Sequence, residues 1–148
     1  MQAPSPKNRI DRRQMTKSAP KKSSDAPSTS GSPLRLVLQV ASTDGKAPKI
    51  LATPLKGRLI IGRSSLDTPV PLDIDLLPFD AANCGVSRQH AVFHFENGSL
   101  SIEDLSSTNG TRINGFQIQS GRQYKLRNGD ELEIGRMRIL IQVVRAPH

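Results

Sequence analysis

Polar side chains able to bind an anion are concentrated in three short segments of the sequence. They are Gly62-Arg63, Ser87-Arg88-Gln89-His90 and Thr108-Asn109-Gly110. Arginine supplies a planar guanidinium that is always charged, while serine, threonine and asparagine supply short neutral donors. Such a set suits a negatively charged group with several acceptor oxygens, for example a phosphorylated side chain. Each segment alone is a weak signal, because Gly-Arg often ends a strand and Asn-Gly is a common turn.

Nucleophilic catalysis is a second interpretation of Ser87 and His90, and the spacing argues against it. Two residues three positions apart across a turn and a strand do not form a nucleophile–base pair, and no third group that would orient the histidine is identifiable. We therefore predict that His90 is structural, with its ring bonded to loop backbone, and that the protein is not an enzyme. His90, His94 and Cys84 match no standard zinc spacing, so we expect neither a metal site nor a cofactor.

Short strands separated by turns make up the sequence from Leu34 onward. Apolar and polar residues alternate in Leu34–Val40 and in Met137–Val143, the pattern of a strand with one buried face. Four Asn-Gly dipeptides supply hairpin turns and leave no room for long helices. The sequence therefore predicts an all-β sandwich. Further expected strands are Arg58–Arg63, His90–Glu96, Ser99–Asp104, Thr111–Asn114, Gln123–Leu126 and Glu131–Ile134.

The stretch from Leu66 to Cys84 contains three prolines and little alternation. We expect a long loop there, with at most one short strand. Three of its four carboxylates, Asp73, Asp75 and Asp80, are expected to be solvated, and Cys84 is expected to be a free thiol in a loop.

The first 33 residues have a different composition. They hold seven Lys and Arg against two acidic residues, five of the 11 prolines and seven serines. Such a segment cannot bury enough apolar surface to offset the entropy lost on ordering, so we expect a disordered tail before one ordered domain at residues 34–148. No apolar run approaches the ~18 residues of a membrane span, and no secretory signal is visible, so the expected location is the cytoplasm.

The order of these motifs resembles the forkhead-associated (FHA) family of phosphothreonine-binding β-sandwiches. The family signature runs Gly-Arg, Ser-x-x-His, Thr-Asn-Gly and a late Asn-Gly-Asp. This chain has all four in that order, the last at Asn128-Gly129-Asp130. The resemblance extends from about Leu34 to Val144. It implies an FHA-type β-sandwich of about eleven short strands, preceded by the tail, and we expect a bacterial member of the family.

The resemblance also implies which residues bind a phosphopeptide. Arg63 and Ser87 would contact the phosphate, and Arg88 the phosphate or the peptide backbone. Thr108 would contact the phosphate or line a pocket for the threonine methyl group, and Asn109 would hold the peptide backbone. Architectural positions that shape the loops without touching the ligand are Gly62, His90 and Gly110. Additional candidates at the rim are Thr111 and Asn114.

The function implied by the resemblance is phosphothreonine-dependent interaction with phosphorylated partner proteins, such as a Ser/Thr kinase or its substrate. A phospho-independent FHA scaffold is one alternative, because some members bind through other surfaces. Nucleic-acid association through the basic tail is another, although aromatics are only 3% of the chain and no nucleic-acid motif is present. Thr16 and Thr29 raise a third hypothesis, in which a phosphorylated tail occupies the chain's own pocket.

Overall fold

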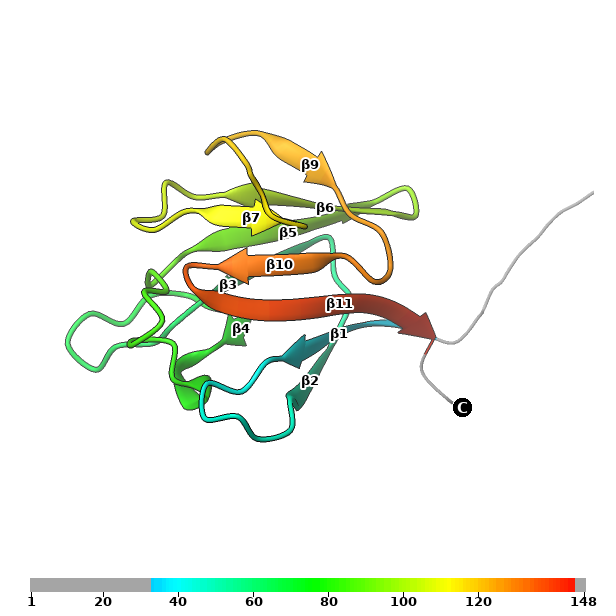
Figure 1. Ribbon diagram of the computed structural model, residues 1–148. Coiled ribbons are helices and arrows are strands. Elements are labelled where there is room, and N and C mark those ends of the chain that lie inside the picture. Colours follow the sequence, from blue (N-terminus) through cyan, green and yellow to red (C-terminus); the bar gives the residue numbers. More distant parts are fainter. Residues whose placement is uncertain (1–32, 146–148) are drawn as a thin grey trace, which may run out of the picture. The chain divides into compact units, whose positions relative to one another are not determined.

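The computed structural model describes residues 33–145, which form two stacked β-sheets (Figure 1). The eleven strands within this range confirm the expected all-β sandwich. The predicted tail lies outside the described residues except for Pro33, and so do the last three residues of the predicted domain. Within residues 33–145, no helix is long and apolar enough to span a bilayer.

The larger sheet has six strands in the order β2-β1-β11-β10-β7-β8, and every neighbouring pair in it is antiparallel. Its longest strands, β1 and β11, pair along the whole of β1, so the two ends of the described chain lie side by side. The strands are β1 (Leu34–Val40), β2 (Lys49–Pro54), β7 (Thr111–Ile113), β8 (Phe116–Gln117), β10 (Glu131–Ile134) and β11 (Met137–Arg145).

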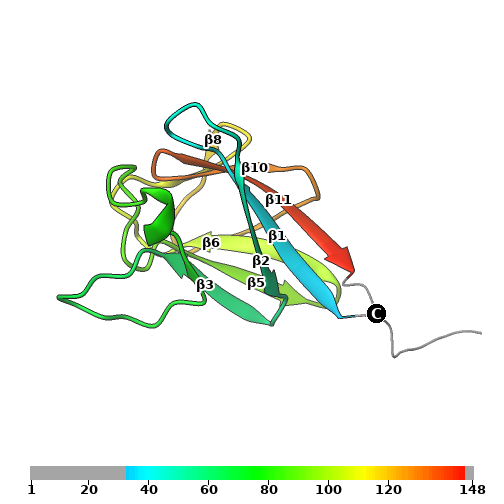
Figure 2. The same ribbon diagram turned by 90° about the horizontal axis from the view of Figure 1, so that it is seen from below.

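The second sheet has five strands in the order β4-β3-β5-β6-β9. Only the short β3–β4 pair is parallel; β3, β5, β6 and β9 pair antiparallel. Figure 2, viewed from below, shows β1 and β2 crossing over β3, β5 and β6 of this sheet. The strands are β3 (Arg58–Gly62), β4 (Ile74–Asp75), β5 (Ala91–Glu96), β6 (Ser99–Asp104) and β9 (Gln123–Lys125).

The core lies between the two sheets, where alternate residues of each strand point inward. In β1, Leu36 and Leu38 are fully buried while the intervening Val37 is only half-buried. Phe93 of β5 is also fully buried, and Phe95 packs against the core at its edge. Burying each such side chain stabilises the fold by about 1.5–3 kcal/mol, so this layer fixes the strand register and with it the loops at the sheet ends.

The stretch from Leu66 to Cys84 contains one short strand, as expected, and also a single 3-10 turn, η2 (Leu77–Phe79), that the sequence did not indicate. Asp73 and Asp80 are exposed, but Asp75 is half-buried and accepts the backbone N–H groups of Ser64 and Leu77. Burial opposes ionisation of Asp75, yet these hydrogen bonds lower its pKa below the ordinary value. Its carboxylate therefore fixes the start of the β3–β4 loop, and the prediction that it is merely solvated was wrong.

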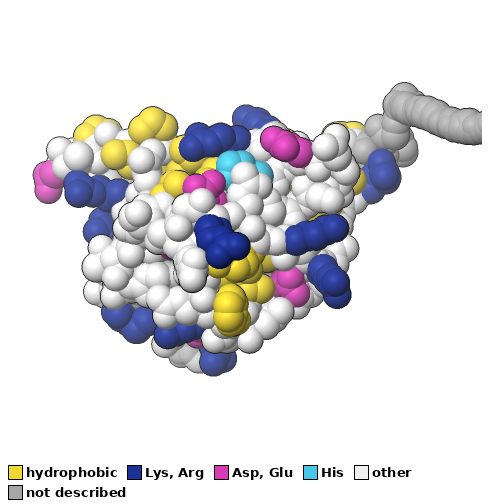
Figure 3. Space-filling view, turned by 90° about the horizontal axis from the view of Figure 1, so that it is seen from above, with side chains coloured by type: hydrophobic (Ala, Val, Ile, Leu, Met, Phe, Trp, Pro, Cys, Tyr) yellow, Lys and Arg dark blue, Asp and Glu magenta, His cyan; other side chains and the backbone are white. Residues whose placement is uncertain are grey.

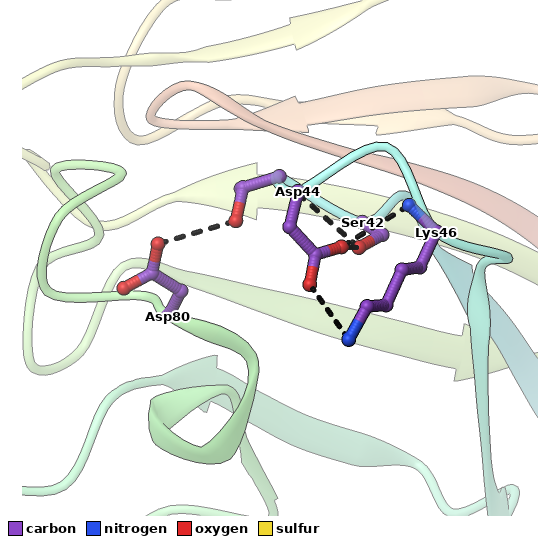
Figure 4. A network of polar contacts seen from close by, with 5 residues as sticks. Ser42, Asp44, Lys46 and Asp80 are labelled. Carbon is purple, nitrogen blue, oxygen red and sulfur yellow. Dashed lines mark hydrogen bonds and ion pairs between the residues drawn. The ribbon is translucent and has the colours of Figure 1, made fainter.

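The segment that follows η2 is held at its beginning by Asp80 (Figure 4). Thr43, in the loop between β1 and β2, donates its hydroxyl to this carboxylate at 3.3 Å, and Asn83 donates its amide at 2.7 Å. Asp44 and Ser42 hydrogen-bond to each other within the same β1–β2 loop. These hydrogen bonds fix the start of the segment 80–90, which contains Ser87 and His90, relative to the β1–β2 loop.

Candidate functional site

Four connections meet at one end of the sandwich, on the left of Figure 1 and of Figure 2. They are the β3–β4 loop, the segment leading into β5, the β6–β7 loop and the β10–β11 turn. The five main residues that the sequence predicts to bind phosphopeptide lie in the first three of these connections, whereas the rim candidates Thr111 and Asn114 lie in β7 and in the β7–β8 turn. The antiparallel pairings of β3 with β5 and of β5 with β6 bring these three connections to the same end.

The end of β3 lies against the backbone that carries Ser87. The Arg63 N–H donates to the carbonyl oxygens of Ser87 and Arg88, each at 3.2 Å. A Cβ on Gly62 would lie 2.0 Å from the Arg88 oxygen, so only glycine permits this approach. The Arg63 guanidinium donates Nε–H to the Val86 carbonyl at 2.7 Å. Its two Nη groups form no hydrogen bond or ion pair within residues 33–145, so this half-buried fork is oriented but still able to bind an anion.

His90 joins the loop before β5 to the loop before β7. Its Nδ1 accepts the Ser87 backbone N–H at 3.0 Å, and its Nε2 lies 2.8 Å from the Gly110 carbonyl oxygen. Because Nδ1 accepts, the neutral ring carries its proton on Nε2 and donates it to Gly110. The ring is fully buried, and both of its nitrogens bond loop backbone, as the sequence predicted.

Burial lowers the pKa of His90 below the ordinary value of 6.5, although the Gly110 carbonyl and the nearby Asp104 carboxylate act in the opposite direction. A proton on Nδ1 would face the Ser87 N–H and break that hydrogen bond. The neutral form is therefore the one that holds the two loops together, and it contributes stability only where the pH keeps it neutral.

Ser87 and Thr108 come together across the two loops. The Ser87 Oγ accepts the Thr108 backbone N–H at 3.1 Å, which leaves the serine hydroxyl proton free to be donated. The neighbouring Asn109 donates Nδ2–H to the Gly85 carbonyl at 2.9 Å, leaving its Oδ1 and second N–H for a ligand. Thr108 and Asn109 are both exposed, so these groups lie at the surface.

Asp104, at the end of β6, organises the β6–β7 loop. Its carboxylate accepts the backbone N–H and the hydroxyl of Ser107, at 3.1 and 2.5 Å, and the hydroxyls of Thr111 and Ser120. Burial opposes its ionisation, but the hydrogen bonds from these three residues together lower its pKa. The Ser107 hydroxyl in turn accepts the Gly110 N–H at 3.0 Å. The turn that carries Thr108 and Asn109 is thus built on one buried anion.

The structure brings the predicted site residues together, with two qualifications. Arg88 is exposed, and its side chain forms no hydrogen bond or ion pair within residues 33–145, so geometry alone gives it no defined role. Thr111 is fully buried and donates to Asp104, so the expectation that it lies at the rim was wrong. Gly110 adopts φ +83°, a left-handed conformation that favours glycine, in agreement with an architectural position.

Sequence reasoning missed Asp104 and its serine partners. A signal existed, because an aspartate that ends a strand and is followed, after Leu105, by Ser-Ser-Thr is typical of a side chain that caps its own loop. Ser120 offered no such signal, since it reaches Asp104 from another loop. Within the described residues, no three His, Cys, Asp or Glu side chains gather closely enough to hold a metal ion.

Basic and acidic side chains both lie on these connections, among them Arg63, Arg88 and Arg136 and the exposed Asp67, Asp73 and Asp80. Figure 3 shows Lys and Arg side chains beside hydrophobic ones at the left, the end that bears the site. Arg63 and Arg88 belong to the site itself, whereas the carboxylates of Asp75 and Asp104 are occupied by hydrogen bonds from the protein. The arrangement can bind an anionic group with several acceptor oxygens.

The β-sandwich carries arginine, serine and asparagine side chains on converging loops, and comparison with known proteins gives its family. The family model for the FHA domain matches residues 59–135, just over half of the chain. The chain belongs to the FHA domain family.

Relatives with this domain occur in bacteria. Protein FraH of Nostoc sp. is 37% identical over 67 residues, which are 45% of this chain and 23% of FraH. The glycogen accumulation regulator GarA of Mycobacterium tuberculosis is 42% identical over 55 residues, which are 37% of this chain and 32% of GarA. The chain therefore matches about a quarter to a third of the length of these relatives.

Solved structures share the fold. One FHA domain, from a structural and functional analysis of phosphothreonine-dependent FHA domain interactions, is 27% identical with a TM-score of 0.54. The match covers 77% of this chain and 99% of that one.

Proposed function

We propose that residues 33–145 bind phosphothreonine in partner proteins, so that the protein is a phosphorylation-dependent interaction module of Ser/Thr kinase signalling. The observation that carries the proposal is a set of unused donors on fixed loops. Arg63 is held in place by the hydrogen bond of its Nε–H to Val86, and its Nη groups remain free to donate. Ser87 is held by the hydrogen bonds of its N–H and its Oγ, and its hydroxyl proton remains free to be donated.

The charge balance favours a phosphate monoester. A phosphorylated threonine carries about −1.5 to −2 charges and three acceptor oxygens. Arg63 offers a planar pair of Nη groups, and Ser87 adds a hydroxyl beside it. Arg88, exposed next to Ser87, adds a second positive charge. Because the fork of Arg63 is already oriented by Val86, binding loses little side-chain entropy.

Thr108 and Asn109 supply contacts beyond the phosphate. In this proposal Thr108 lies against the phosphate or the methyl group of the ligand's threonine, which favours phosphothreonine over phosphoserine. Asn109 holds the peptide main chain through its free Oδ1 and its second N–H. These roles follow the family resemblance and agree with the exposure of both residues.

The module acts by binding and not by catalysis. Both ring nitrogens of His90 are engaged by backbone groups, so His90 does not accept a proton from the Ser87 hydroxyl. The partners that fit are a Ser/Thr kinase or its phosphorylated substrates, in the cytoplasm. A phospho-independent scaffold would leave the free donors of Arg63 and Ser87 without a ligand, and nucleic-acid contact would depend on the tail, which lies outside the described residues.

Fluorescence anisotropy with a degenerate phosphothreonine peptide pool tests the proposal. The comparison pools are the same peptides without phosphate and with phosphoserine. We expect binding to the phosphothreonine pool only, lost in Arg63→Ala and Ser87→Ala. Arg58→Ala is the matched control, because Arg58 is exposed at the opposite end of the same strand. Undiminished binding by both site variants would refute the proposed site.

A further inference from the structure

One arginine at this end of the sandwich is not accounted for by phosphate binding. Arg136 lies in the turn between β10 and β11, the fourth connection that reaches the site. Its backbone N–H donates to the Cys84 carbonyl at 2.7 Å, and its Nη2 donates to the Asn83 carbonyl at 2.7 Å. Two bonds to one short segment hold this exposed side chain against the loop that carries Ser87.

Gly85 lies between the Arg136 guanidinium and the side-chain amide of Asn109, and it has no side chain to separate them. A Cβ built on Gly85 would lie 2.3 Å from the Asn109 Nδ2 and 3.2 Å from the Arg136 Nη1. The guanidinium and the Asn109 amide are therefore close neighbours, with no side chain of residue 85 between them. Gly85 has φ +73°, so a larger residue there would be strained as well as crowded.

The donors of Arg136 are only partly used. Nη2 donates to the Asn83 carbonyl, while Nη1 and Nε form no hydrogen bond within residues 33–145. No acidic side chain of the described residues forms an ion pair with it. An oriented guanidinium with free donors beside a peptide-binding group fits a carboxylate, because Arg and carboxylate pair through parallel hydrogen bonds.

The position of Arg136 is within reach of a peptide bound by its phosphate. Thr108, held by the Ser87 hydroxyl oxygen, is adjacent in sequence to Asn109, and Asn109 adjoins Arg136 across Gly85. An extended peptide advances about 3.3 Å per residue, so a chain anchored at Ser87 passes Arg136 within a few residues of its phosphothreonine.

We propose that Arg136 is a specificity-determining residue that binds the carboxylate of an aspartate or glutamate in the phosphopeptide, a few residues from the phosphothreonine. The inference rests on the proposed function, because it requires that the phosphopeptide follow Asn109. It adds a second anchoring point and restricts the targets to phosphothreonine sequences with an acidic residue at one defined position.

A peptide scan distinguishes this role from general electrostatic attraction. One phosphothreonine peptide with alanine elsewhere is compared with variants carrying a single aspartate at each of the four positions on either side. A basic protein surface favours aspartate weakly at every position, whereas Arg136 favours it at one. We expect about fivefold tighter binding at that position, the scale of a partly exposed ion pair, measured by anisotropy at 0.15 M salt.

The variants separate specificity from loop structure. Arg136→Ala is expected to abolish the fivefold preference while binding the all-alanine phosphopeptide as the wild type does. Arg136→Glu is expected to prefer lysine to aspartate at the same position. Arg138→Ala, two residues further along in β11 and also exposed, should leave the preference unchanged. If Arg136 only supports the loop, Arg136→Ala weakens all phosphopeptides equally.

The binding data distinguish failure of the role of Arg136 from failure of the proposed function. If phosphopeptides bind in an Arg63-dependent way but no aspartate position is preferred, the role of Arg136 is overturned and the proposed function stands. The same holds if the aspartate preference persists in Arg136→Ala. Absence of phosphopeptide binding by the folded wild-type protein would overturn both.

Discussion

Replacing Gly62 by alanine tests whether the end of β3 packs directly on the Ser87–Arg88 backbone. The added Cβ would lie 2.0 Å from the Arg88 carbonyl oxygen, 2.7 Å from its carbonyl carbon and 2.9 Å from the Ser87 oxygen. All three are backbone atoms, so no side-chain rotation relieves the overlap, and the two segments must separate. Gly62 has no positive φ, so the effect comes from crowding alone.

Separation of these segments would weaken the two hydrogen bonds from the Arg63 N–H and displace its guanidinium from Val86. Overpacking of this kind costs about 1–3 kcal/mol, and the buried position places Gly62→Ala near the upper end, with a fall in Tm of roughly 10 °C. We also expect phosphopeptide binding at 25 °C to weaken by about tenfold or more, because the Arg63 fork loses its orientation.

The matched control is Gly57→Ala, just before the same strand. A Cβ there would meet nothing nearer than the Phe95 carbonyl oxygen at 3.9 Å, an ordinary contact. Urea denaturation and anisotropy on the same preparations measure both effects. Wild-type stability and affinity in Gly62→Ala would refute the close packing of β3 on the Ser87 segment.

Three further outcomes follow from the loop geometry. First, the free energy of unfolding in urea should fall as the pH drops below 6.5, because His90 binds a proton more readily in the unfolded chain than in the folded one, where its pKa is lowered. The free energy of unfolding then changes by up to about 1.4 kcal/mol per pH unit. A His90 ring that NMR shows to be protonated at pH 6.5 would contradict this. Second, Asp104→Asn should lower the free energy of unfolding by about 2 kcal/mol and weaken phosphopeptide binding, because a single amide oxygen cannot accept all the hydrogen bonds that Ser107, Thr111 and Ser120 donate to the carboxylate. Glu103→Gln, on the other face of β6, is the control. Equal stability of the two variants would show that the Asp104 carboxylate does not organise the β6–β7 loop. Third, the Cys84 thiol should resist alkylation until the protein unfolds, since burial raises its pKa; rapid labelling of the native protein would show that the segment opens.

Strands with a strong local alternation of apolar and polar residues could be predicted from the sequence. The alternation in Leu34–Val40 gave β1 with its bounds, because each buried leucine is separated by a less buried neighbour. Strand β2 was missed, since Lys49–Pro54 is an edge strand whose residues are all at least partly exposed, so no apolar stripe is needed there. Strand β8, two residues long, is too short to show any period.

The site was predictable only where one segment carries its own signal. The Ser87–His90 segment places a donor and a supporting ring on one turn, and the ring bonds loop backbone as expected, with Nδ1 accepting the Ser87 N–H. The bonds of Ser120 to Asp104 and of Arg136 to Asn83 join residues 16 and 53 positions apart. Such contacts depend on how the sheets bring loops together, and no local pattern encodes them.

We propose that phosphothreonine binds between the β3–β4, β4–β5 and β6–β7 connections, and an NMR titration shows which of their amides it contacts. A phosphothreonine peptide is added to 15N-labelled full-length protein, with the unphosphorylated peptide as reference. We expect the backbone amides of Arg63, Ser87 and Thr108, together with the Asn109 side-chain amide, to shift first and only with the phosphorylated peptide. Shifts confined to the outer faces of the sheets, or equal for both peptides, would contradict this proposal.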